Sequence, residues 1–110
     1  MKPPKVIHVG PIRYAVVFAE HAIAVVERGD ADRLYAHHDP RKQQITVDPD
    51  QGPDQLADSL LHEVLHACVA VTGIDETLGD KEETVVRSLS TCLLDVIRRN
   101  PRLVEWLAAP

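Results

Sequence analysis

Residues 53–73 read PDQLADSLLHEVLHACVAVTG, and both the fold and the candidate site are predicted from this stretch. Its apolar residues recur at helical spacing, which predicts a helix from about Asp54 to Thr72. Either Asp50 or Asp54 is suited to cap its start, and Gly73 is a natural stop. One apolar stripe follows from the spacing: Leu60, Leu61, Val64, Cys68 and Val71.

Residues 62–66 form the motif H-E-x-x-H within this helix. At 100° per residue, His62 and His66 lie about 40° apart on one face, so both imidazoles can reach one zinc ion at roughly 2.0–2.1 Å. Glu63 is next to them around the helix, where it is better placed to take a proton from a zinc-bound water than to bind the ion. Chance alone gives roughly 0.02 such motifs in a chain of this composition.

The context of the motif favours a metal site over a solvated or structural histidine pair. The helix is apolar around most of its circumference, and the histidines lie on a narrow polar arc with the small residues Ser59 and Ala70. Such an arc on a helix that is otherwise buried is typical of a cleft wall.

Two histidines require a third ligand, and the same helix does not supply it. The longer motif H-E-x-x-H-x-x-G-x-x-H is excluded because Val69 and Thr72 occupy its glycine and last histidine positions. The next helix begins with Glu82 and Glu83, and residues 73–79 are enough to bring it back antiparallel. The apolar periodicity of that helix slightly favours Glu82, although either glutamate can simply stabilise a helix N-terminus.

Before residue 50 the pattern is that of strands rather than helices. Four short runs have strand character, and turn residues separate them in pairs at Gly10-Pro11 and at residues 39–42. Segment 20–28 is compatible with a short helix or a strand. We expect a small, mostly antiparallel sheet from these runs: Lys5–Val9, Tyr14–Ala19, Leu34–His38 and Gln44–Asp48.

The chain after residue 73 predicts two further helices. The first runs from about Asp80 to Arg99, and the second, Leu103–Ala108, is expected to pack Trp106 onto the body. With the sheet first and the helices after it, residues 1–110 predict a single α+β domain. The positions expected to face inward in the longer helix are Val85, Val86, Leu89, Leu93, Val96 and Ile97.

Composition excludes several classes of function. The formal net charge is −5, which argues against a nucleic-acid surface. No apolar run approaches the ~20 residues of a membrane span, and the first ten residues do not form a signal peptide, so we expect a soluble, cytoplasmic protein. Cys68 and Cys92 are predicted to be buried free thiols.

The sequence resembles the small gluzincin-like proteins encoded by phages, which are similar in plan to the ImmA/IrrE-type peptidases. The resemblance covers most of the chain after about Leu34. This chain departs from the larger peptidases in its small size. It implies a zincin-like fold, location in the host cytoplasm, and Glu83 as the third ligand, with Val86 and Ser90 at the small or apolar positions that follow it. Four stretches carry it: LYAHHDPRKQQITVDPD, LLHEVLHACVAVTG, EETVVRSLSTCLLDVIRRNP and LVEWL.

We therefore expect one Zn²⁺ held by His62, His66 and Glu83, with Glu82 as the reserve ligand and Glu63 as the catalytic base. The expected activity is hydrolysis of a peptide bond in a protein or peptide substrate. The first alternative is a small non-catalytic zinc-binding or interaction protein with a structural or vestigial site. The second is hydrolysis of a non-peptide amide, such as a cell-wall cross-link. Sequence leaves the substrate and the oligomeric state open.

Three supporting roles can be assigned to groups of residues by type only. An edge strand at Gln44–Asp48 is expected to bind an extended substrate. A donor to the oxyanion of the tetrahedral intermediate would come from Tyr35, His37, His38 or Arg87. A carboxylate that orients a ligand histidine would come from Asp75, Glu76, Asp80 or Asp95.

Overall fold

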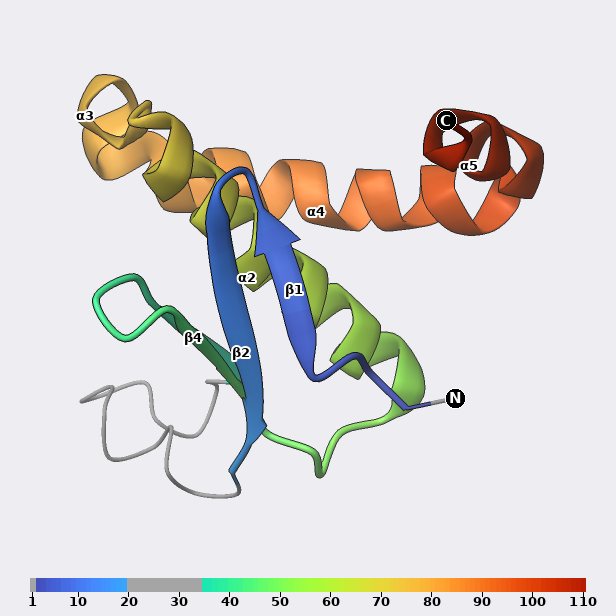
Figure 1. Ribbon diagram of the computed structural model, residues 1–110, viewed down its shortest axis with the longest axis horizontal. Coiled ribbons are helices and arrows are strands. Elements are labelled where there is room, and N and C mark those ends of the chain that lie inside the picture. Colours follow the sequence, from blue (N-terminus) through green and yellow to red (C-terminus); the bar gives the residue numbers. More distant parts are fainter. Residues whose placement is uncertain (1, 20–34) are drawn as a thin grey trace.

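The computed structural model describes residues 2–19 and 35–110 (Figure 1). Segment 20–28, which the sequence left open between helix and strand, lies outside these residues. The described chain is α+β: a small sheet comes first, and the long helices follow it. This order is the one predicted.

The four strands form one mixed sheet in the order β1-β2-β4-β3. They are β1 (Val6–Val9), β2 (Ile12–Phe18), β3 (Ala36–Asp39) and β4 (Gln44–Val47). The outer pairs, β1–β2 and β3–β4, are antiparallel as expected, whereas the central pair β2–β4 is parallel.

The position of β4 corrects one prediction. The strand at Gln44–Asp48 was expected at the edge, but β4 lies between β2 and β3, so β3 forms that edge. The physical reason is burial, because Ile45 and Val47 have no exposed surface and an interior strand gives their side chains the most cover. The edge at β3 brings His37 and His38 beside the cleft described below.

Helix α2 (Pro53–Thr72) has the predicted extent and ends at Gly73, whose φ of 77° lies in the left-handed region. The predicted aspartate cap at its start is wrong. The cap residue is Gly52, without a side-chain hydrogen bond, and Pro53 takes the first helical position, where a missing N–H costs nothing. Asp54 lies inside the first turn, where its charge complements the helix dipole.

A short helix α3 (Asp75–Leu78) and a 3₁₀ turn η2 (Gly79–Lys81) reverse the chain into α4 (Glu82–Arg99). Paired side chains show that α4 runs antiparallel to α2. His66 contacts Glu82, Asp58 accepts a hydrogen bond from Thr91, and Asp54 pairs with Arg98. The last helix is α5 (Pro101–Ala108), which starts two residues earlier than predicted.

The core lies between the sheet and α2, and α4 packs on the other side of α2 (Figure 1). Buried strand residues such as Tyr14, Ile45 and Val47 meet Ala67 of α2 there. This arrangement places α2 between the sheet and α4, and a cleft lies where α2, β3 and α4 meet.

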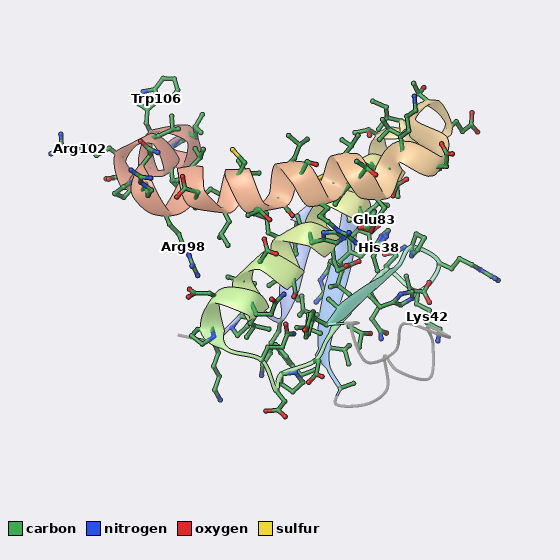
Figure 2. All side chains as sticks on the ribbon, turned by 180° about the vertical axis from the view of Figure 1, so that it is seen from behind. His38, Lys42, Glu83, Arg98, Arg102 and Trp106 are labelled. Carbon is green, nitrogen blue, oxygen red and sulfur yellow. The ribbon has the colours of Figure 1, made fainter. Side chains whose placement is uncertain are left out.

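The packing of α4 and α5 corrects further predictions. In α4 only Val86 and Ser90 are buried, while Leu89, Leu93 and Ile97, predicted to face inward, are exposed. The reason is that α2 is the main neighbour of α4 in the described chain and covers one side of it, while α5 and η2 contact α4 to a smaller extent. Trp106 was expected to pack onto the body but is 74% exposed and points away from it (Figure 2).

Both cysteines are free, as predicted, but they are not both buried. Cys68 is half-buried against the core, whereas Cys92 is exposed on α4. Of the helices in the described ranges, none combines the length and apolarity that crossing a bilayer requires.

Candidate metal centre

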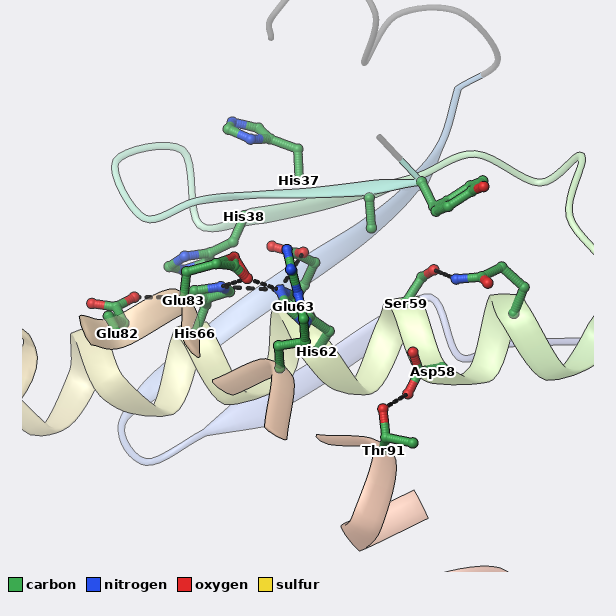
Figure 3. Close-up of a pocket in the computed structure, with 14 residues that line it drawn as sticks. His37, His38, Asp58, Ser59, His62, Glu63, His66, Glu82, Glu83 and Thr91 are labelled. Carbon is green, nitrogen blue, oxygen red and sulfur yellow. Dashed lines mark hydrogen bonds and ion pairs between the residues drawn. The ribbon is translucent and has the colours of Figure 1, made fainter. Parts of the chain in front are cut away.

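Helix α2 presents His62 and His66 on one face, four residues apart. Their ring centroids are 4.8 Å apart, and their Nε2 atoms lie 3.2 Å from each other. The two Nε2 atoms therefore converge on a common point (Figure 3). Two imidazole nitrogens at this distance are held together best by a cation or a shared proton, because their lone pairs otherwise repel.

Glu83, in the first turn of α4, brings a carboxylate to the same point. Its Oε1 atom lies 2.6 Å from His62 Nε2 and 3.4 Å from His66 Nε2. Tetrahedral zinc with ligands at roughly 2.0–2.1 Å separates its ligand atoms by roughly 3.3 Å. Two of the three separations in this cluster match that value, and the third, at 2.6 Å, would have to lengthen by about 0.7 Å. The three residues that were predicted as ligands thus lie close enough together to hold one metal ion.

Glu82 contacts the other nitrogen of His66. Its Oε2 atom lies 2.6 Å from His66 Nδ1. An ionised carboxylate only accepts hydrogen bonds, so Nδ1 is the donor, and in a neutral ring Nε2 is left with its lone pair. Glu82 therefore orients His66 as a carboxylate behind a ligand histidine does.

This contact resolves two predictions. Glu82 was held as the reserve ligand, but it faces Nδ1 of His66 rather than the convergent Nε2 atoms. The four residues predicted to orient a histidine are not those that do so, and none of them lines the cleft. They lie on α3 and η2 or more than three turns along α4: Asp75, Glu76, Asp80 and Asp95.

Glu63 is buried, with 9% of its surface exposed. Its Oε2 atom lies 3.9 Å from His62 Nε2, on the side of the histidines that faces the cleft. Glu63 is thus beside the convergent nitrogens and outside the ligand set, as the helical spacing predicted.

Burial lowers the pKa of His62, against the opposing effect of the Glu83 carboxylate. A lower pKa keeps the ring neutral at more acidic pH, and only a neutral imidazole has a lone pair to offer a metal. The environment of His62 therefore favours the protonation state that binds a metal ion.

The opposite wall of the cleft is β3. His38 Nε2 lies 3.1 Å from the hydroxyl of Tyr14, and burial lowers the pKa of His38, followed by the effect of the nearby His66. Burial also raises the pKa of Tyr14. The sequence did not single out Tyr14, although its place among alternating apolar residues of β2 is a signal for burial.

The walls enclose an open cleft of about 1030 Å³ (Figure 3). Beyond the histidines it continues along α2, where Ser59 donates to Gln51 and accepts from Gln55. All four residues proposed as oxyanion donors line it: Tyr35, His37, His38 and Arg87. Sequence did not identify the far end of the cleft: Gln55, Asp58 and Thr91.

No protein-family model, curated protein or solved structure matches this chain. The gluzincin-like resemblance therefore stays a prediction.

Proposed function

We propose that this chain is a zinc-dependent peptidase with a zincin-like fold. The observation that carries the proposal is the cluster of His62, His66 and Glu83, whose ligand atoms converge in a cleft beside the buried carboxylate of Glu63. Two histidines and one glutamate are the ligand set of many catalytic zinc sites, in which the fourth position is left to water or substrate.

The donor set also favours zinc over harder cations. Imidazole nitrogen suits zinc and other transition metals, whereas Ca²⁺ and Mg²⁺ prefer oxygen ligands only. When bound, zinc would polarise the scissile carbonyl and lower the pKa of a water molecule. Every other part of the reaction falls to side chains of the cleft.

Glu63 is the proton carrier in this scheme. Its carboxylate accepts a proton from the attacking water and then delivers it to the nitrogen of the departing amine. The water oxygen ends on the acyl group as the C–N bond breaks. Glu82 keeps Nε2 of His66 free of its proton throughout, because it holds the Nδ1 proton.

The edge strand β3 offers a way to hold an extended substrate. Tyr35, Ala36, His37 and His38 line the cleft from that edge. A peptide that adds to β3 through main-chain hydrogen bonds would pass in front of the histidines. This replaces Gln44–Asp48, which lies inside the sheet, as the proposed docking strand.

The test is cleavage of a proteome-derived peptide library by the zinc-loaded chain, read by mass spectrometry, with Glu63→Gln as the comparison. We expect wild type to cleave, and Glu63→Gln to keep its zinc while losing roughly 10²–10⁴-fold in rate. Glu76→Gln, an exposed change on α3, is the matched control and should cleave normally.

Absence of cleavage by a wild type that holds zinc would contradict the peptidase and favour the non-catalytic alternative. Equal rates in wild type and Glu63→Gln would remove Glu63 from the mechanism.

A further inference from the structure

Arg87 is a cation on the wall of the cleft, one helical turn beyond the ligand Glu83. Because α4 runs antiparallel to α2, with Glu82 at His66 and Thr91 at Asp58, Arg87 lies level with His62. Arg87 and His62 line the same cleft. The guanidinium is therefore on the stretch of the cleft that holds the proposed metal centre.

The carboxylates around Arg87 are already engaged. Glu83 contacts His62, Glu82 contacts His66, and Asp58 accepts a hydrogen bond from Thr91. In the part of the chain that the structure describes, no carboxylate lies within 4.0 Å of the Arg87 guanidinium. By contrast, the other arginines of α4 are paired, Arg98 with Asp54 and Arg99 with Asp95.

An exposed guanidinium that faces a cleft, and has no carboxylate partner among the described residues, is suited to binding an anion from outside. Its planar fork matches a carboxylate in two parallel hydrogen bonds, which a lysine cannot reproduce. Gln55 lines the same cleft, and because its Nε2 atom donates only one of its two N–H groups, to Ser59, the second remains for a further polar contact.

We propose that Arg87 binds a carboxylate of the substrate next to the scissile bond, so that the cleft selects acidic peptides. This inference rests on the proposed function. Two sources share the chemistry: an Asp or Glu side chain, or the free C-terminus of a peptide. A paired charge-assisted contact of this kind strengthens binding by roughly tenfold to hundredfold.

The test measures binding rather than turnover, with three short peptide hydroxamates and the full zinc-loaded chain. A hydroxamate group chelates zinc directly, so the probes differ only in their acidic group. One probe is neutral and ends in an amide, one ends in a free carboxylate, and one carries a Glu side chain and an amide end. Dissociation constants are determined calorimetrically for wild type, Arg87→Gln, Arg87→Lys and the matched control Arg99→Gln.

We expect wild type to bind one of the acidic probes roughly tenfold to hundredfold more tightly than the neutral probe, and the favoured probe identifies the source. Arg87→Gln should lose this preference, Arg87→Lys should keep part of it, and Arg99→Gln should keep all of it. Because Arg87 is exposed, its variants should fold and hold zinc as wild type does.

Equal affinity of wild type for all three probes would overturn the carboxylate site and leave the metal centre standing. The carboxylate site would also be overturned if Arg87→Gln lost the same amount of affinity for the neutral probe as for the acidic probes. That result would mean that Arg87 contacts the zinc-binding end of the probe. Failure of every hydroxamate to bind wild type would overturn both this inference and the open zinc site.

Discussion

The Nδ1 atom of His66 lies 2.6 Å from a carboxylate oxygen of Glu82, and its Nε2 atom faces Glu83 instead. Two consecutive glutamates of α4 thus serve the two sides of one imidazole. They can do so because neighbouring residues of a helix point about 100° apart. Glu83 lies beside the converging Nε2 atoms, while Glu82 orients the ring from behind.

This division predicts different zinc affinities for the two glutamate variants. Glu82→Ala should weaken zinc binding by roughly 10–100-fold while one ion still binds at saturation. Glu83→Ala removes a proposed ligand and should weaken zinc binding more than Glu82→Ala does. Competition with a chromophoric chelator measures both, and Glu76→Ala, outside the cleft, is the control. A larger loss in Glu82→Ala than in Glu83→Ala would assign Glu82 as the ligand.

Zinc should stabilise the fold, since the site joins α2 to the start of α4 and an unfolded chain cannot present it. At a free zinc concentration of about 100 Kd, the free energy of unfolding should rise by about 2.7 kcal/mol. Urea denaturation with and without zinc measures the gain. The gain should vanish in His66→Ala. If zinc leaves the free energy of unfolding of the wild type unchanged, that result would contradict a site that spans the two helices.

Local spacing was sufficient to bring the residues predicted as metal ligands together, although the choice of Glu83 over Glu82 came from the family resemblance. His62, Glu63 and His66 are fixed by the period of one helix, and the short return at residues 73–81 brings the start of α4 beside them. The orienting role of Glu82 was missed because periodicity ranks residues by face. It does not reveal which atom of a histidine each carboxylate meets.

Predictions that depended on long-range packing were less successful. The interior place of β4 follows from its parallel pairing with β2, across a connection whose path the sequence pattern does not fix. Leu89 was assigned inward from the apolar period of its helix, and Trp106 was expected to pack onto the body. Their exposure shows that an amphipathic stripe is buried only where a second layer covers it, and α2 covers just one side of α4.

The histidines of the cleft should make the metal-free protein sensitive to acid. Burial lowers the pKa of both His38 and His62 from the ordinary value of 6.5. As the pH falls below that value, the unfolded chain takes up protons that the folded chain does not. The free energy of unfolding should therefore be greatest above pH 6.5 and fall through the lower pKa values of the folded state.

Urea unfolding between pH 7.5 and 5.5, with a chelator present, measures this fall. His38→Gln should show a shallower pH dependence than wild type. A wild-type stability that rises on acidification over this range would contradict the direction of both shifts.

The core between the sheet and α2 should dominate stability. Ile45 has no exposed surface, so Ile45→Ala should lower the free energy of unfolding by about 2–5 kcal/mol. Leu107 is 66% exposed on α5, so Leu107→Ala should change the free energy of unfolding by no more than about 0.5 kcal/mol. Denaturation of the two variants measures the difference. Similar losses of unfolding free energy in the two variants would mean that another surface covers α5 in solution.

Elemental analysis of untagged protein, purified without chelator, tests the metal centre most directly. Wild type should carry about one zinc per chain, His62→Ala should carry none, and Glu83→Ala should retain zinc only weakly. Wild type without metal, even after zinc is added back and excess removed, would contradict the account.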